Sequence, residues 1–355
     1  MRIGILTYHR ANNYGAVLQC FALQELLKEM GHDVQIVDYR QPFIEKLYRP
    51  SLMSQILRYK FHPRALIAAC HNFERQRTID LSFEKFRDTY FNQSICCTSE
   101  SIPNYDVYIV GSDQMWSIDC VGNKIDPVYF GLFNRPKHSR LIGFSISSNI
   151  YSINTLGKRL ESYIQNFDKI SLREQIIANA VIRNISIDVQ VTLDPTLCAD
   201  VDLWDKIINQ DWKTKKYVVL YHVMFRFAPI VHDMLLKQTK RIAELHGWDV
   251  IDLSVGNYSV SDFVSAIKYA QCVITSSFHA TVFSIIFSRP LFSVRLHDGN
   301  DERYVNLLKS LHMEQALVDL DFAQNAPVVY DYNNIHEFML QLRKSSLDYL
   351  KANLQ

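Results

Sequence analysis

Residues 273–287 read VITSSFHATVFSIIF. The β-branched residues at the start predict a buried strand, and the small residues that follow predict the start of a helix. His279 then lies just after the carboxyl end of the strand, in the first turn of the helix. Free backbone N–H groups and the positive end of the helix dipole favour an anion at such a point. The imidazole can exchange a proton near neutral pH, or it can simply fill a polar gap in the core.

The length and composition of the chain exclude several classes of protein. At 355 residues the chain is too long for one ordinary core, so two domains are expected. The hydrophobic content of 48% and the charged content of 21% are typical of a folded protein, and a net charge of +1 provides no field that would attract a nucleic acid. The seven cysteines are scattered and form no CxxC pair, which favours neither zinc nor a disulfide framework and indicates a cytoplasmic protein.

Short apolar strands alternate with amphipathic helices along two successive parts of the chain. A strand at the start leads through a polar loop into a helix at residues 16–30, which ends at Gly31 before the next strand. The loop lacks a GxGxxG motif, so dinucleotide binding is not expected. This alternation predicts an α/β protein with mostly parallel sheets covered on both faces. We expect one domain over residues 1–199 and a second over residues 200–355, which ends in a helix near residues 335–350.

A basic segment, residues 42–77, interrupts the first of these domains. Aromatic and aliphatic residues alternate there with cations, which predicts a helical insertion. The basic residues are Lys46, Arg49, Arg58, Lys60, Arg64, Arg75 and Arg77. They can form the solvated face of an amphipathic lid, or they can dock to an anionic membrane surface or a lipid-phosphate-linked acceptor.

Polar residues come directly after the expected strands of both domains. The candidate site residues in these positions are Asn13, Asp113, Ser147, Arg173 and His279. Ligands of open α/β sheets bind at the carboxyl ends of the strands. We therefore expect these side chains to converge on a cleft between the two domains, although they lie far apart in the sequence.

Each of these side chains has a chemical and a structural interpretation. The guanidinium of Arg173 offers a fork to a carboxylate or a phosphate, but it can equally form an ion pair with Glu174. Asp113 lies in a tight turn, where it can be a general base or can cap the turn. Asn13 and Gly15 allow a sugar hydroxyl to approach amide and backbone groups closely. No histidines stand at the spacing of metal ligands, so no metal is expected.

Together these segments resemble the polysaccharide pyruvyl transferase family. The resemblance runs from the amino terminus to about residue 308 and omits the insertion. The matching segments include residues 4–9 (GILTYH), 13–19 (NYGAVLQ), 106–116 (DVYIVGSDQMW), 170–174 (ISLRE), 193–196 (LDPT) and 276–283 (SSFHATVF). Their order and joint presence make the resemblance specific, rather than any single segment.

The resemblance implies a fold, an activity and a cellular location. The fold is that of two Rossmann-like, doubly wound domains facing a cleft, as in glycosyltransferase-B enzymes, with the acceptor on the N-terminal side and the donor on the C-terminal side. The activity is transfer of a pyruvyl group from phosphoenolpyruvate to two hydroxyls of a hexose in a cell-surface polysaccharide precursor, which forms a ketal and releases phosphate. No cofactor is implied. The location is the cytoplasm or the inner face of the membrane, where a sugar or lipid-linked oligosaccharide acceptor is found.

The resemblance also implies roles for individual residues. His279, Asp113 and Arg173 would be catalytic. The donor and its phosphate would be bound by Arg173, Ser276, Ser277, His279, Ala280 and Arg295, and the acceptor by Asn13, Gly15, Gln114 and Ser147. The chain departs from the family pattern at Ala280, where a glycine is usual, and at residues 146–148, which read ISS where Ala-Ala-Ser is frequent.

Two other functions fit the same pair of domains. One is that of a glycosyltransferase with a nucleotide-sugar donor, and the other is that of a non-catalytic glycan-binding protein. Arg295 also keeps two interpretations, because it follows the last strand of the second domain and can either reach the cleft or lie in a solvated loop.

Overall fold

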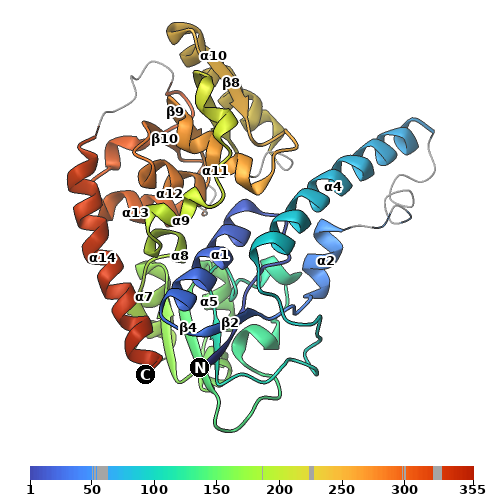
Figure 1. Ribbon diagram of the computed structural model, residues 1–355, viewed down its shortest axis with the longest axis vertical. Helices are drawn as coiled ribbons and strands as arrows, with labels where there is room; N and C mark the ends of the chain where they lie inside the picture. The colour runs from blue at the N-terminus through green and yellow to red at the C-terminus, as the bar shows by residue number, and fades with distance from the viewer. Residues whose placement is uncertain are drawn as a thin grey trace. The chain divides into compact units, whose positions relative to one another are not determined.

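The computed structural model describes residues 1–49, 51, 53, 63–185, 187–223, 228–297, 299, 301–322 and 330–355 (Figure 1). These residues form two compact units. The first unit consists of Met1–Ala199 together with Arg343–Gln355, and the second consists of Asp200–Leu342. Each unit contains one parallel sheet with helices packed on it.

The first unit is built on six parallel strands in the order β2–β1–β3–β4–β5–β6. The strands are β1 (Arg2–Leu6), β2 (Asp33–Ile36), β3 (Val107–Val110), β4 (Arg140–Ile146), β5 (Lys169–Leu172) and β6 (Gln190–Val191). Ile3 of β1 lies opposite Val34 of β2 on one side and Val107 of β3 on the other, and all three are buried. Strands covered on both faces have nearly continuous apolar runs, as β1 and β3 do.

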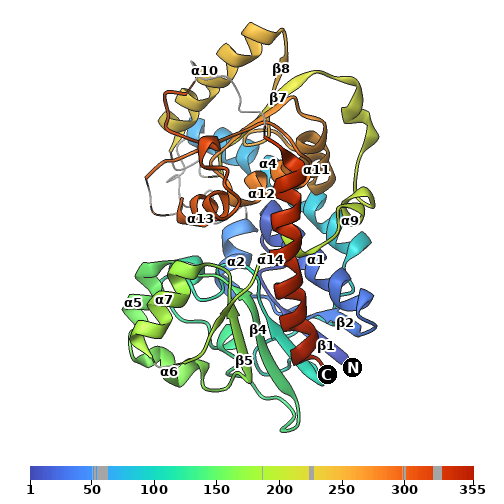
Figure 2. The same ribbon diagram turned by 90° about the vertical axis from the view of Figure 1, so that its left-hand side faces the viewer.

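Helices cover both faces of this sheet. The helices of this unit are α1 (Tyr14–Glu29), α2 (Pro42–Tyr48), α4 (Pro63–Tyr90), α5 (Ile150–Leu156), α6 (Arg159–Ile164), α7 (Gln175–Asn184) and α8 (Pro195–Cys198). Parallel strands are joined by right-handed crossovers, and β2 lies on one side of β1 while β4, β5 and β6 lie on the other. The helix between β1 and β2 therefore covers the face opposite the helices that follow β4 and β5. Figure 2 shows α5, α6 and α7 grouped away from α1.

The second unit has five parallel strands in the order β11–β10–β9–β7–β8. The strands are β7 (Tyr217–Tyr221), β8 (Asp249–Asp252), β9 (Cys272–Thr275), β10 (Leu291–Val294) and β11 (Leu317–Val318). The helices are α9 (Val201–Asp205), α10 (Pro229–His246), α11 (Val260–Tyr269), α12 (Phe278–Ile286), α13 (Glu302–Ser310) and the first part of α14 (Tyr332–Asn353). The α/β class with two doubly wound parallel sheets, predicted from the sequence, is confirmed.

The strand order changes direction at one point in each sheet. In the first sheet β1 lies between β2 and β3, and in the second β7 lies between β8 and β9. Connections leave such a pair of strands toward opposite sides, so the loops at their carboxyl ends part and leave room for a ligand. The loops after β1 and β3, and those after β7 and β9, are therefore the positions to search for a site.

The last helix, α14, differs from the prediction in one respect. The sequence placed this whole helix in the second domain, but residues from Arg343 onward pack with the first unit. Arg343 donates to the backbone oxygens of Leu197 and Ala199, and the Tyr349 hydroxyl donates to the oxygen of Gly143 in β4 at 2.9 Å. Hydrogen bonds to backbone carbonyls are not visible in an amphipathic pattern, which reports only the apolar face.

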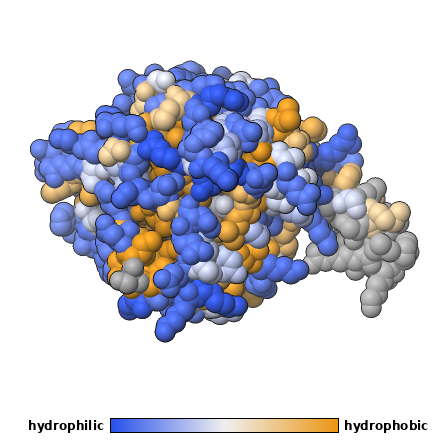
Figure 3. All heavy atoms as spheres, turned by 90° about the horizontal axis from the view of Figure 1, so that it is seen from below, coloured by the Kyte–Doolittle hydropathy of each residue, from blue (hydrophilic) through white to orange (hydrophobic). Residues whose placement is uncertain are grey.

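Apolar side chains are concentrated in the cores of the two units. The largest enclosed side chains include Trp116 and Phe21 in the first unit and Trp204 in the second. The face of the molecule drawn in Figure 3 is mainly hydrophilic, with apolar patches between the polar residues. Among the described residues, no helix combines the length and the apolar character that crossing a bilayer requires.

Gly111, at the end of β3, allows the chain to turn at the β1/β3 point of the first sheet. Its φ is +136°, and a Cβ at this position would overlap the backbone oxygen of Phe144. We predict that Gly111→Ala lowers the free energy of unfolding by about 3 kcal/mol or more. Gly31→Ala is the matched control, because Gly31 also has a positive φ but nothing lies within 4 Å of the added carbon. Urea unfolding of both variants measures this; equal losses would show that the contact with Phe144 does not matter.

Candidate functional site

The loops after β3, β4, β5 and β6 meet around the guanidinium of Arg173 at the carboxyl edge of the first sheet. Its Nε donates to Glu174 Oε1 at 2.7 Å, its Nη1 to Asp194 Oδ2 at 2.9 Å and its Nη2 to Ser147 Oγ at 2.9 Å. Asp194 Oδ2 also accepts the hydroxyl of Ser112 at 3.1 Å. One cation and two carboxylates therefore join the ends of four neighbouring strands.

This group of charges is enclosed by the protein. The side chains of Arg173, Glu174 and Asp194 are 3%, 4% and 0% exposed. Burial lowers the pKa of Arg173. The carboxylates of Glu174, Asp194 and Asp113 raise it by more than burial lowers it, so the pKa of Arg173 lies above its ordinary value. The sequence left open whether Arg173 binds an anion or pairs with Glu174, and the structure has the ion pair. A role of Arg173 in donor binding stays a prediction.

Asp113 and Gln114, in the turn after β3, lie beside this group. Asp113 is partly exposed, and its φ of 80° is in the left-handed region. Residues other than glycine rarely adopt this region, and those that do are frequent at functional sites. Its Oδ1 accepts the backbone N–H of Gln114 at 2.8 Å, and its backbone oxygen accepts that of Ser147 at 2.9 Å. The Tyr8 hydroxyl donates to the backbone oxygen of Gln114 at 3.2 Å. The turn is thus connected to the loops after β1 and β4.

Asn13 and Gly15 lie at the amino end of α1, which follows β1. The Asn13 side chain is the N-cap of this helix, and its Oδ1 accepts the backbone N–H of Ala16 at 3.2 Å. Asn13 is partly exposed, whereas Gly15 is buried in the first turn. Side-chain capping satisfies one of the N–H groups that a helix leaves unpaired at its start. The structure therefore places Asn13 and Gly15 at the same sheet edge as Asp113, Gln114, Ser147 and Arg173, and their roles toward an acceptor stay predictions.

A buried pair of one histidine and one aspartate near this edge was given no role from the sequence. His9 follows β1; its Nε2 lies 3.1 Å from Asp38 Oδ1, and its Nδ1 lies 3.2 Å from the backbone oxygen of Thr7. Burial lowers the pKa of His9, and its contacts with Asp38 and Thr7 only partly offset this. Burial raises the pKa of Asp38, but the hydrogen bonds from His9 and Arg40 outweigh it and hold this pKa well below its usual range. The sequence signal that could have found this pair is a polar residue shortly after each of the first two strands, His9 after β1 and Asp38 after β2.

In the second unit, the segment from Ser276 to Ala280 turns from β9 into α12. The backbone N–H of Ser276 donates to the oxygen of Tyr221, the last residue of β7, so the turn lies at the β7/β9 point. Ser277 caps α12, and its hydroxyl accepts the N–H of Ala280 at 3.4 Å. His279 is the second residue of the helix and is 8% exposed. The strand-to-helix turn with a histidine in the first helical turn is thus confirmed.

Four further polar residues lie at the same edge and were missed in the sequence. His222 follows β7, and its ring stacks on that of His232 with centroids 5.8 Å apart. His232 Nε2 lies 2.9 Å from Oδ2 of Asp252, the last residue of β8. Ser254 accepts the backbone N–H of His222 at 2.8 Å. The signal that could have found them is the polar residue at the end of each apolar strand.

The remaining predicted donor residue, Arg295, follows β10. Its Nη2 lies 3.1 Å from Asp319 Oδ1, and the two side chains are 38% and 63% exposed. This surface pair leaves the guanidinium partly accessible to solvent. Arg295 comes after the strand that lies beside β9, so it is at the same sheet edge as His279.

The predicted basic insertion is helical in part and not uniformly solvated. It contains α2 and the first half of α4, and α4 continues beyond residue 77 to Tyr90. Arg49 is largely enclosed by carboxylates, whereas Arg58 and Lys60 lie outside the described residues. A membrane contact through this segment stays a prediction.

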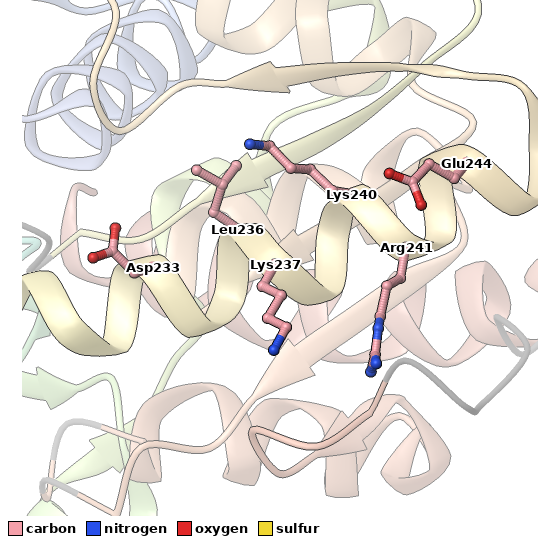
Figure 4. Close-up of a pocket in the computed structure, with 6 residues that line it drawn as sticks. All are labelled: Asp233, Leu236, Lys237, Lys240, Arg241 and Glu244. Carbon is pink, nitrogen blue, oxygen red and sulfur yellow. The ribbon is translucent and has the colours of Figure 1, made fainter.

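A hollow of about 420 Å³ lies along α10, and none of the predicted site residues lines it (Figure 4). It is lined by Asp233, Leu236, Lys237, Lys240, Arg241 and Glu244. All six belong to one helix, and charges of both signs lie side by side, which does not favour one kind of ligand. Within the described ranges, no group of three or more histidine, cysteine, aspartate or glutamate side chains is arranged to hold a metal ion.

The sequence between Asn13 and residue 298 decides which family this protein is in. A model of the family described as "Polysaccharide pyruvyl transferase" matches residues 13–298. The chain belongs to this family. No curated protein matches this pyruvyl transferase family member.

Several solved structures are similar to this family member over most of its length. Spinosyn Forosaminyltransferase SpnP is 11% identical, with 98% of this chain and 95% of that chain covered and a TM-score of 0.45. UDP-GlcNAc 2-epimerase from Methanocaldococcus jannaschii is 10% identical, with 96% and 92% covered and a TM-score of 0.47. E. coli heptosyltransferase WaaC with ADP is 12% identical, with 96% and 100% covered and a TM-score of 0.36. Similarity at this level carries no inference about the activity of the pyruvyl transferase family member.

The structure groups the predicted site residues by unit. Asp113, Gln114, Ser147 and Arg173 are joined by a continuous set of contacts. Their counterparts in the second unit are at the carboxyl edge of the second sheet. The convergence of His279 and Arg173 on one cleft stays a prediction, because the two belong to different units.

The buried position of Arg173 predicts a large effect on stability. We expect Arg173→Ala to lower the free energy of unfolding by about 3–5 kcal/mol, because it leaves the carboxylates of Glu174 and Asp194 buried without their cation. Arg295→Ala removes a guanidinium from an exposed pair and should cost at most about 1 kcal/mol. Chemical unfolding of both variants measures the difference. A loss for Arg173→Ala no larger than that for Arg295→Ala would contradict this view of the buried group.

The lowered pKa of His9 predicts a pH dependence of stability. Unfolded histidine has a pKa of about 6.5 and takes up a proton that folded His9 resists, so its contribution is complete above that pH and is lost as the pH falls. Asp38 acts in the same direction but in a more acidic range. Between pH 7 and 5, the free energy of unfolding of the wild type should fall faster than that of His9→Gln, by up to about 1.4 kcal/mol per pH unit. Urea titrations across this range test the prediction, and parallel curves would refute it.

Proposed function

We propose that this family member transfers a pyruvyl group from phosphoenolpyruvate to two hydroxyls of a hexose in a polysaccharide precursor. The observation that carries the proposal is the family match over residues 13–298. The strand order supports it, because each sheet has a point of reversed order at which polar side chains gather. A sugar or lipid-linked oligosaccharide would occupy the point in the first sheet, and phosphoenolpyruvate that in the second.

The reaction needs one acid and one base. A proton added to the methylene carbon of phosphoenolpyruvate creates an oxocarbenium-like centre at the neighbouring carbon, and the first sugar hydroxyl attacks it and loses its proton. The second hydroxyl then displaces phosphate and closes the ketal, and its proton leaves with the phosphate or the base. The protons balance: of the two lost by the hydroxyls, one replaces the proton given to the new methyl group and the other leaves with the phosphate.

His279 is the group we assign to the donor. It lies in the first turn of α12, where Ser277 caps the helix and the positive end of the dipole favours the phosphate. An imidazole there can protonate the methylene carbon or bind the leaving phosphate. Ser276, Ala280 and the partly exposed Arg295 complete the proposed donor side.

Asp113 is the group we assign to the acceptor. It is a partly exposed carboxylate in the turn after β3, and its unusual φ fixes where the side chain leaves the backbone. Asn13, Gly15, Gln114 and Ser147 are the proposed acceptor contacts. In this proposal Arg173 holds the loops of Ser147 and Asp194 in place through the hydrogen bonds it already makes. Contact with the donor would require it to exchange one of these partners.

The proposal is tested by mixing the purified protein with phosphoenolpyruvate and a panel of methyl galactosides and methyl mannosides. We expect phosphate release that depends on the acceptor, together with a product whose mass has gained one pyruvyl ketal. Turnover with nucleotide sugars alone would replace the proposal with glycosyl transfer. Sugar binding without turnover of either donor would indicate a non-catalytic protein.

Within this assay His279→Ala should lower kcat by about 10²–10⁴-fold, the usual contribution of a positioned acid or base. His138→Ala is the matched control, because His138 is exposed in the loop before β4. The melting temperature of both variants should stay close to that of the wild type. Full activity of His279→Ala, or a loss of activity explained by unfolding, would remove His279 from the proposed mechanism.

A further inference from the structure

We propose that α2 and α4 position the loop at residues 8–13 for the acceptor through a cluster of three arginines and three carboxylates. We call residues 8–13 the acceptor loop. The members of the arginine cluster are Arg10, Arg49, Arg87, Glu45, Asp80 and Glu84. This inference rests on the proposed function, since it assigns the insertion helices a part in binding the same acceptor.

The acceptor loop is held directly by side chains from the two helices. Arg87 of α4 donates through Nη2 to Asn12 Oδ1 at 3.0 Å and through Nη1 to the backbone oxygen of His9 at 3.4 Å. Asn12 Nδ2 donates to Asp80 Oδ1 at 3.0 Å. Both ends of the Asn12 amide are therefore occupied by α4, directly beside Asn13, the residue proposed to contact the acceptor.

Arg10 gives the loop a second attachment. It donates to Glu84 of α4 at 2.6 and 3.1 Å and to Glu45 of α2 at 3.3 Å. Arg49, which follows α2, donates to the backbone oxygen of Arg10 at 3.1 Å. The loop backbone and one of its own side chains are thus fixed to both helices.

The electrostatics favour the closed cluster. Burial raises the pKa of Glu84, but the neighbouring Arg87, Arg10 and Arg49 outweigh it and lower this pKa below its ordinary value. Three cations face three carboxylates, so the group is neutral as a whole. The Arg87 side chain is fully enclosed and that of Arg10 is 8% exposed, so the hydrogen bonds are strong and geometrically specific.

The attachment of α4 to the unit does not depend on these charges. Phe83 packs on Tyr14 with ring centroids 5.2 Å apart, and Phe86 packs on Phe21 at 5.9 Å. Tyr14 and Phe21 belong to α1, so aromatic contacts hold the second half of α4 on the helix that starts after the loop. Changes in the cluster should therefore move the acceptor loop more than they unfold the insertion.

Arg87→Lys tests the inference, because lysine keeps the charge but lacks the planar fork whose two nitrogens bond Asn12 and His9. With the methyl glycoside that the wild type converts, we expect the acceptor KM to rise roughly tenfold while kcat and the phosphoenolpyruvate KM stay unchanged. Arg183→Lys, the same change at an exposed position in α7, is the matched control. Asn12→Ala should raise the acceptor KM as well, and the effect of the double variant should be smaller than the sum of the two single effects, because both variants break the same Arg87–Asn12 contact.

Hydrogen exchange separates this inference from the proposed function. In Arg87→Lys the amides of residues 8–13 should exchange faster, whereas those of α7 should not change. Unchanged exchange in the loop, additive effects of Arg87→Lys and Asn12→Ala, or a parallel loss of kcat and of affinity for both substrates would overturn the inference. If the wild type transfers no pyruvyl group, the proposed function fails, and the exchange measurement alone decides whether α4 fixes the loop.

Discussion

A single enclosed guanidinium, that of Arg173, holds the carboxyl edge of the first sheet together. Its partners come from the loops after β4, β5 and β6, and Asp194 extends the contact to the loop after β3. Removing a charge from water is costly, so such a group is stable only when all its partners are present. The polar groups at this edge therefore have little conformational freedom, because their loops share one cation.

The corresponding edge of the second sheet is built on different chemistry. Thr275 donates to the oxygen of Tyr221 at 2.7 Å and accepts the N–H of Ser277 at 3.0 Å, and Ser254 supports His222 in the same way. Hydroxyl groups support these turns, and the carboxylate of Asp252 lies beside them, where its Oδ2 is 2.9 Å from His232 Nε2.

Much of the fold and part of the site could be predicted from the sequence. Apolar runs followed by polar residues marked the strand ends at Asp113, Ser147, Arg173 and His279, because parallel strands bring such residues to one edge. The partners were harder to foresee. Glu174 is adjacent in sequence, but the pairing of Arg173 with Asp194 depends on β6 lying beside β5. The ion pairs of Arg49 with carboxylates of α4 could not be predicted either. A basic amphipathic segment does not show which of its cations will contact carboxylates from another helix.

The way α14 divides its contacts constrains how this protein is made. The helix begins in the unit formed by residues 200–342, but Tyr349 stacks on Phe144 and bonds to β4 in the other unit. During synthesis on the ribosome, the first sheet stays without this covering helix until all of residues 200–342 have been made. Until then β4 exposes apolar surface that the finished molecule conceals, which makes the nascent chain a natural client for a chaperone.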